Sequence, residues 1–240
     1  MESITARVAI TQSPLFFTWP DQIRARMIAS ADILRLAPGD YLQAAGEFAT
    51  HIFIVASGSV RLVRMAANGR EFTVWIYFPG DFHGLGPIMT GEAYASAAIA
   101  REPAVIVRVP STVIREIVSQ NGALVFSLFK ALDGRHRRIL GLYETAVTLP
   151  VRARLLDLLV SIVLRQRPAA KSAEILLSQG ELAVMLGSRR QVVNRIMTRL
   201  EHESLLEAQY GRIVVPDVSR LRCVRDGEVG APQATQHRPA

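Results

Sequence analysis

The residues with the clearest chemistry lie between Arg189 and Arg199, where four arginines and two side-chain amides fall within eleven positions. Steps of three and four residues return to one face of a helix, so the polar positions of this segment would share a face. Arginine can donate two hydrogen bonds to a guanine edge, and glutamine or asparagine can pair similarly with adenine. This pattern predicts a helix that reads double-stranded DNA. The predicted DNA contacts, phosphate-binding positions included, are Ser178, Gln179, Arg189, Arg190, Gln191, Asn194, Arg195 and Arg199.

Capping and turn signals around this segment predict the two helices that must position it. Ser178 is followed three residues later by Glu181, which is the spacing of a capping box. Gly187 can end that first helix, and Ser188 with Gln191 repeats the start signal for the second. The predicted buried stripe of the second helix is Val192, Val193, Ile196, Met197 and Leu200. Two short helices joined at a glycine make a helix-turn-helix, and residues 205–217 would add a small β-wing.

The sequence lacks the residue patterns that enzymatic or metal-dependent chemistry would require. The five histidines are at least 32 residues apart and no H-x-H occurs, which argues against a metal-dependent, cupin-like β-roll enzyme. No G-x-S-x-G, Walker loop or C-x-x-C is present, so we expect no enzyme. A regulatory β-roll subunit of a kinase or channel is the other alternative, and the helix-turn-helix and the lack of a membrane span argue against it.

Charge and cysteine usage indicate a partner and a compartment. The formal net charge is +7, and residues 150–225 hold 13 Arg and Lys against 7 Asp and Glu, while residues 1–149 hold 14 against 12. An excess of basic residues in the last third of the chain favours binding to a polyanionic partner. Cys223 is the single cysteine, so no internal disulfide forms. No signal peptide and no run of about 18 apolar residues is seen, which predicts a cytoplasmic protein without a membrane partner.

The strand and helix patterns predict an α+β fold whose N-terminal part, residues 1–110, is a β-rich domain; the antiparallel, jelly-roll-like β-roll and its sensing role are what the family resemblance described below implies. Short apolar runs between Ile33 and Pro110 are broken by Gly and Pro, as in a sandwich or small barrel. Asn68-Gly69 predicts a tight hairpin. His51 and His83 match no ligand motif, and we interpret them as hydrogen-bonded structural residues.

Residues 111–147 lack proline and predict one long helix. Apolar residues recur there in steps of three and four, with Arg135 in one expected position. This stripe predicts a homodimer seam, and the alternative is a helix that packs on its own β-domain; the length of the helix favours the dimer. The seam residues are Val125, Leu128, Leu132, Ile139, Leu142 and Ala146. Residues 150–225 would form the winged helix-turn-helix, and residues 226–240 a disordered tail.

The segment GSRRQVVNRIMTRLE resembles the recognition helix of the Crp/Fnr family, with Arg189 where that family usually has Ser. PGDYLQAAGE, IVASGSVRLV, NGREFTVWIYFPGDFHG and VRARLLDLL extend the resemblance from Ile33 to Leu221. It implies a cyclic-nucleotide-binding-type β-roll, a long dimer helix and a winged helix-turn-helix. It also implies base contacts from Arg190, Gln191 and Arg195, a near-palindromic operator and, for an activator, contact with RNA polymerase.

The same resemblance implies an effector pocket that has lost its anchors for cyclic AMP. Leu85 stands where the family's cyclic-AMP binders have Glu, and Ala95 where they have the phosphate-binding Arg. The predicted pocket positions are Gly84, Leu85, Ala95, Ser96, Ile139 and Leu140. Without the cation a cyclic phosphate loses its charge-assisted partner, so we expect an effector other than cyclic AMP. A single cysteine excludes an iron–sulfur cluster, and the sequence assigns no cofactor, target gene or direction of regulation.

Overall fold

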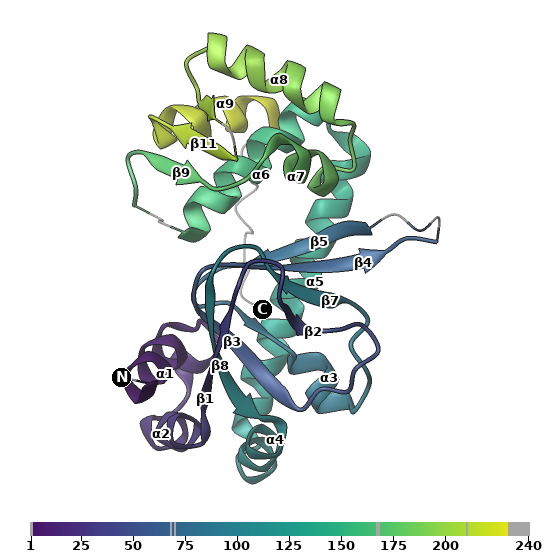
Figure 1. The fold of residues 1–240 in the computed structure, drawn as a ribbon. Helices are drawn as coiled ribbons and strands as arrows, with labels where there is room; N and C mark the ends of the chain where they lie inside the picture. Colours follow the sequence, from purple (N-terminus) through teal and green to yellow (C-terminus); the bar gives the residue numbers. More distant parts are fainter. Residues whose placement is uncertain (1, 68, 70, 167–168, 210, 230–240) are drawn as a thin grey trace, which may run out of the picture. The chain divides into compact units, whose positions relative to one another are not determined.

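The computed structural model describes residues 2–67, 69, 71–166, 169–209 and 211–229. The chain forms two compact units, Met1–Arg138 and Ile139–Ala240 (Figure 1). The first unit holds two four-stranded antiparallel sheets, with strand orders β1-β8-β3-β6 and β2-β7-β4-β5. Their strands are β1 (Asp32–Leu36), β2 (Tyr41–Gln43), β3 (His51–Ser57), β4 (Val60–Met65), β5 (Glu71–Tyr77), β6 (Phe82–His83), β7 (Ala97–Ala100) and β8 (Ala104–Pro110).

These sheets confirm the predicted antiparallel β-roll. The predicted hairpin is also confirmed, because β4 pairs with β5 from Val60 opposite Tyr77 to Met65 opposite Glu71. Gly69 adopts a left-handed φ of 76°, which glycine tolerates, whereas Asn68 lies outside the described residues. A short helix, α3 (Leu85–Thr90), interrupts the region expected to be entirely β.

Strand β3 has apolar side chains on both faces because both faces are covered. Phe53 and Val55 pack into a core with side chains of both sheets. Ile52 and Ile54 point to the other side, where they pack against Phe16 and other residues of the surrounding helices. A strand buried on both faces reads as a continuous apolar run rather than an alternating one.

The first thirty residues are mainly helical, which the sequence interpretation missed. They form α1 (Glu2–Gln12), a 3₁₀ turn η1 (Phe16–Thr18) and α2 (Asp21–Ser30). Phe16 and Trp19 are buried beside Ile52 and Ile54, so this segment covers the outer face of β3. The Trp19 indole Nε1 donates to Ser127 Oγ at 2.9 Å, which ties the segment to the long helix.

The single long helix predicted for residues 111–147 is wrong in one respect. It is two helices, α4 (Ser111–Gln120) and α5 (Ala123–Thr148). Asn121 breaks the helical path with φ −135° and ψ 75°, and its Nδ2 donates to the Ile117 carbonyl at 2.8 Å. That bond satisfies an acceptor at the end of α4, where no further helical N–H reaches.

Helix α5 turns the beginning of the predicted dimer seam toward its own β-roll. Leu128 is 4% exposed in the core, and Val125 packs against the same cluster. Arg135 places its guanidinium 5.9 Å from the Tyr77 ring centroid and donates to the Phe82 carbonyl at 3.2 Å. The first part of the predicted seam is therefore an intramolecular contact, whereas Leu132, Ile139 and Leu142 are exposed and stay predicted seam residues.

The opposite face of α5 is exposed. It carries large apolar side chains that are half or more exposed, namely Phe126, Phe129, Leu140, Tyr143 and Val147. Asp133 and His136 continue their three- and four-residue spacing between Phe129 and Leu140. This face repeats with the heptad period that two packed helices share.

The second unit is a winged helix-turn-helix. Its strands form one sheet in the order β10-β11-β9. Its elements are α6 (Val151–Gln166), β9 (Ala173–Ile175), α7 (Gln179–Met185), α8 (Arg190–His202), β10 (Glu207–Gln209), β11 (Arg212–Val215) and α9 (Val218–Val229). Residues 226–229 were expected in a disordered tail but complete α9, because its Val218 and Leu221 are buried. Residues 230–240 lie outside the described residues.

Within the part of the chain that the structure describes, no helix combines the length and apolarity needed to cross a bilayer.

Candidate nucleic-acid interface

Helix α7 begins and ends as the sequence predicts. The Ser178 hydroxyl accepts from the Glu181 N–H, and the Glu181 carboxylate accepts from the Ser178 N–H at 2.8 Å, which completes the capping box. At the other end Gly187 has φ 58°, and the Ser188 N–H bonds the Ala183 carbonyl at 2.9 Å. This is a Schellman ending, which turns the chain sharply into the second helix.

Helix α8 begins without the predicted cap. Its N-cap residue is Arg189, which makes no side-chain capping bond, and not Ser188. The reason is that Ser188 belongs to the Schellman ending of α7, and the first carbonyl to accept a helical N–H of α8 is that of Arg189, from Val193 at 3.2 Å. The first turn of α8 therefore has no side-chain acceptor of its own, and its positive end suits an anion.

The buried face of α8 is narrower than the sequence predicts. Val193, Met197 and Leu200 are fully buried, whereas Ile196 is half-buried and Val192 is 36% exposed. Three buried positions at spacings of four and three are enough to seat a helix of this length on its neighbours.

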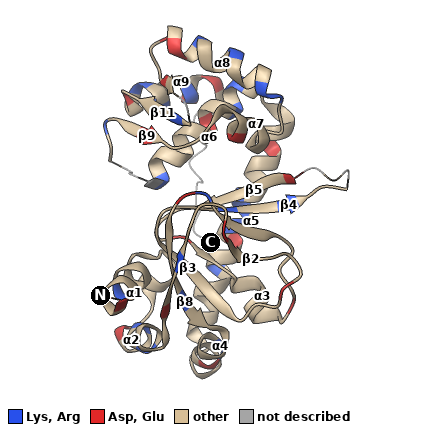
Figure 2. Ribbon diagram, in the orientation of Figure 1, with Lys and Arg blue, Asp and Glu red and all other residues tan. Residues whose placement is uncertain are grey.

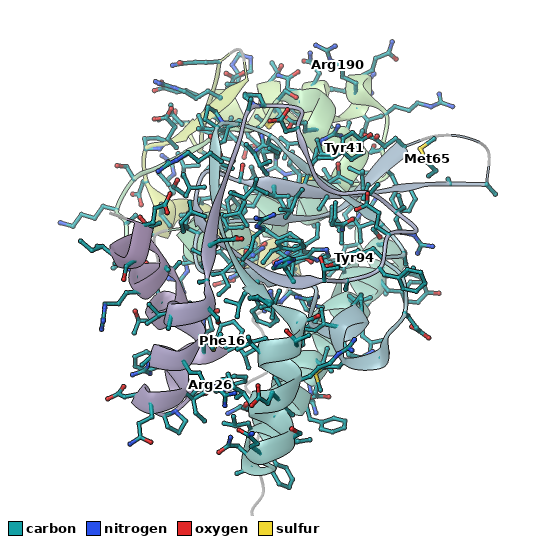
Figure 3. The ribbon with its side chains drawn as sticks, turned by 60° about the horizontal axis from the view of Figure 1, so that its bottom comes forward. Phe16, Arg26, Tyr41, Met65, Tyr94 and Arg190 are labelled. Carbon is teal, nitrogen blue, oxygen red and sulfur yellow. The ribbon has the colours of Figure 1, made fainter. Side chains whose placement is uncertain are left out.

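The opposite face of α8 brings the predicted contact residues together. Figure 2 shows basic residues along this helix and acidic residues near its C-terminal end. The exposed side chains are Arg189, Arg190, Gln191, Asn194, Arg195 and Arg199. Among the described residues these arginines form no ion pair, and the Arg190 side chain projects away from the ribbon (Figure 3). Four uncompensated cations on one helix face favour a polyanionic ligand.

Bonds from neighbouring elements hold the two helices and the wing together. Arg154 of α6 donates to the carbonyl of Leu186, the C-cap of α7, at 3.0 Å. Glu201 of α8 accepts from the Ala208 N–H of β10 at 2.8 Å. Ser178 and Gln179, half-buried at the start of α7, are the remaining predicted contacts.

The residues predicted for the effector pocket are divided between the two units. Gly84 (φ 99°) precedes α3, Leu85 is only 1% exposed, and the Ser96 carbonyl accepts from Gln43 at 3.1 Å. Ala95 is exposed. The other two predicted positions lie on α5 in the second unit and are about half exposed, namely Ile139 and Leu140.

The interior of the β-roll holds a polar aromatic cluster that sequence reasoning did not find. Gln43 Nε2 lies 2.9 Å from His83 Nε2, and His83 Nδ1 lies 3.1 Å from the Tyr77 hydroxyl. An amide nitrogen only donates, so His83 Nε2 accepts and Nδ1 carries the proton of the neutral ring. The Tyr94 ring stacks on His83 with centroids 5.2 Å apart. The interpretation of His83 as a hydrogen-bonded structural residue is confirmed.

Acidification should therefore destabilise the β-roll through His83. Burial, assisted by the Arg135 charge, lowers the pKa of His83 to about 3. Between that value and the usual 6.5, the unfolded chain binds a proton that the folded protein does not, so stability falls as pH falls. From pH 7 to pH 5 this group should cost about 2 kcal/mol. Urea unfolding at both pH values should show a smaller loss for His83→Gln than for the wild type, and an equal loss would contradict this.

Known proteins resemble the chain over most of its length. The cyclic nucleotide-binding domain family matches residues 33–121, and the Crp-like helix-turn-helix domain family matches residues 153–224. A CRP-like cAMP-activated global transcriptional regulator of Mycobacterium tuberculosis is 25% identical over 226 residues, covering 92% of this chain and 98% of the relative. The transcriptional activator protein Anr of Pseudomonas aeruginosa is 24% identical over 202 residues, covering 81% and 80%. The structure of FixK2 from Bradyrhizobium japonicum has the same fold, with a TM-score of 0.72 at 19% identity over 80% of this chain and 96% of FixK2.

A β-roll followed by a helix-turn-helix with an exposed basic second helix defines a DNA-binding transcription regulator. The chain belongs to the Crp/Fnr family of these regulators, with a cyclic nucleotide-binding domain in front of a Crp-like helix-turn-helix.

Proposed function

We propose that the protein is a homodimeric, sequence-specific regulator that binds a near-palindromic operator and responds to an effector other than cyclic AMP. The single observation that carries the DNA assignment is the exposed face of α8, which presents both arginines and side-chain amides; the arginines form no ion pair with any residue that the structure describes. Since it acts on DNA, its place is the cytoplasm. As an activator it would also contact RNA polymerase.

The proposed roles follow from position on the helix. Arg190, Gln191 and Arg195 lie on the exposed face from the first turn of α8 onward, and Asn194 lies beside them, so they read base edges. Phosphates are bound by residues at the margins, namely Ser178, Gln179, Arg189 and Arg199. The uncapped start of α8 adds backbone N–H donors for a phosphate.

The exposed face of α5 supports the homodimer. Apolar residues at the ends of this face would pack against their copies in a second chain, and Asp133 with His136 would form a polar layer that fixes the register. Asp133 already accepts from Arg137 of its own helix at 2.6 Å, which balances its charge. A two-fold dimer presents two recognition helices, so the half-sites should be about 34–36 Å apart.

The DNA assignment is tested by titration of a duplex that the full-length protein selects from a randomised library. Binding to the selected duplex should resist excess random duplex, and the logarithm of affinity should fall linearly with the logarithm of salt concentration. Equal binding to both duplexes would refute sequence-specific recognition. No binding to either duplex would refute the proposal that DNA is the partner.

The effector proposal predicts that cyclic AMP neither binds the protein nor strengthens its binding to the selected duplex. Leu85 is buried and apolar and Ala95 offers no cation, so the cyclic phosphate has no charged partner from these positions. A ligand shifts an equilibrium only through differential affinity, so the switch should be absent as well. Calorimetric titration of the protein with cyclic AMP tests this proposal. A saturable isotherm in the micromolar range, together with tighter DNA binding in the presence of cyclic AMP, would overturn it. Leu85→Glu with Ala95→Arg, which restores the pair, is the positive control for weak binding.

A further inference from the structure

The C-terminal end of α8 is held by an arginine from the start of α6. Arg152 donates from Nη1 and Nη2 to the two carboxylate oxygens of Glu203, at 3.0 and 2.7 Å. Its third donor, Nε, reaches the Glu228 carboxylate of α9 at 2.7 Å. A guanidinium used in this two-pronged way fixes direction as well as distance. Arg152 therefore links three helices through one side chain.

A second arginine binds the same helix end. Arg220 of α9 donates from Nη2 to the backbone carbonyl of Glu203 at 2.9 Å. Glu203 is the C-cap of α8, so two cations lie at the negative end of the helix dipole. We call Arg152, Arg220, Glu203 and Glu228 the α8-end cluster.

The backbone at this end explains why external support is needed. Ser204 has φ 57° and is the one residue other than glycine with a positive φ among the described residues. Its N–H bonds the Glu201 carbonyl at 2.8 Å, and the Leu205 N–H bonds the Leu200 carbonyl at 3.0 Å. This is a Schellman ending with serine where glycine is usual, so it is strained and persists only if its surroundings enforce it.

The α8-end cluster is better suited to orienting α8 than to stabilising the fold. The Arg152 and Glu203 side chains are 24% and 44% exposed, and ion pairs so open to water add little stability. A helix that reads bases must instead be held within about 0.5 Å and 10–20° of its productive geometry. Arg152 and Glu228 also lie just outside residues 153–224, which match the helix-turn-helix family.

We infer that Arg152 is a positioning residue for DNA recognition: through Glu203 it fixes the end of α8, and through Glu228 it makes α9 a support for that helix. Its part in recognition rests on the proposed function of α8. Arg152 touches no base in this role, and its effect passes through the direction of the helix.

The experiment compares full-length wild type with Arg152→Gln and with Arg222→Gln. Arg222 is exposed on α9. The Arg222→Gln substitution removes the same charge from the same unit but leaves the α8-end cluster unchanged. On the selected duplex, Arg152→Gln should lower the ratio of specific to random-duplex affinity by roughly three- to tenfold. The salt slope should stay unchanged, whereas a lost phosphate contact would reduce it by about one. Arg222→Gln should keep the specificity ratio.

Rescue and hydrogen exchange separate the inference from the proposed function. Ser204→Gly relieves the backbone strain, so adding it to Arg152→Gln should restore most of the specificity ratio. In the DNA-free protein, Arg152→Gln should speed exchange of the Ser204 and Leu205 amides, with the thermal midpoint within about 5 °C of wild type.

Unchanged exchange and an unchanged ratio would overturn the inference, as would a loss accompanied by a lower salt slope. Faster exchange in a protein whose wild type shows no duplex preference would instead refute DNA reading and leave the support of the helix end established.

Discussion

Phe129→Glu is expected to convert the dimer into monomers. Phe129 is 66% exposed on the heptad face of α5, where a second copy would bring its own residue 129 close by. Two buried like charges without partners cost several kcal/mol, more than a helix pair tolerates. Because the proposed dimer would bind two half-sites at once, operator affinity should fall by about 100-fold or more. Sedimentation velocity measures the first effect and duplex titration the second.

The control for this variant is Leu142→Glu, which makes the same kind of change on the face of α5 predicted from the sequence. Leu142 is 44% exposed but lies one helical position away from Tyr143 of the heptad face. Its variant should sediment as a dimer. Dissociation of Leu142→Glu with an intact Phe129→Glu dimer would favour the seam inferred from the sequence.

Arg190→Ala should remove discrimination at one base pair in each half-site. Arg190 is the first residue of α8, is exposed and forms no ion pair among the described residues, so its fork is available for a guanine edge. The loss should be about 1–3 kcal/mol for each contact on the selected duplex, with relaxed preference at one position. Titration of duplexes substituted at each position in turn measures it.

Arg199→Ala is the matched comparison, because it removes the same side chain from the last turns of the same face. As a phosphate contact it should weaken selected and random duplexes alike and lower the salt slope by about one. If Arg190→Ala also weakened both duplexes equally, base reading by Arg190 would be wrong.

Local signals predicted the DNA-binding elements well, because their causes lie within a few residues. The Ser178–Glu181 box and the left-handed Gly187 each depend on contacts inside one turn of chain. The start of α8 was misplaced by one residue, since a serine followed three residues later by glutamine does not reveal that Ser188 belongs to the Schellman ending of α7.

The dimer seam could not be placed from periodicity alone. Two stripes of α5 share the heptad spacing, and only the fold shows that Leu128 and Arg135 face their own β-roll. The His83 cluster could not be predicted from the sequence for a similar reason. Its partners Gln43 and Tyr77 are 40 and 6 residues away in sequence, and the two sheets bring them together.

Both tryptophans of the chain touch α5, which gives this helix a built-in optical reporter. Trp19 is 2% exposed and donates its indole N–H to Ser127, while Trp75 lies 5.3 Å from the guanidinium of Arg138. Any shift of α5 against the β-roll changes the surroundings of at least one indole. Intrinsic fluorescence of the unlabelled protein therefore follows the position of the long helix during titration with a candidate effector.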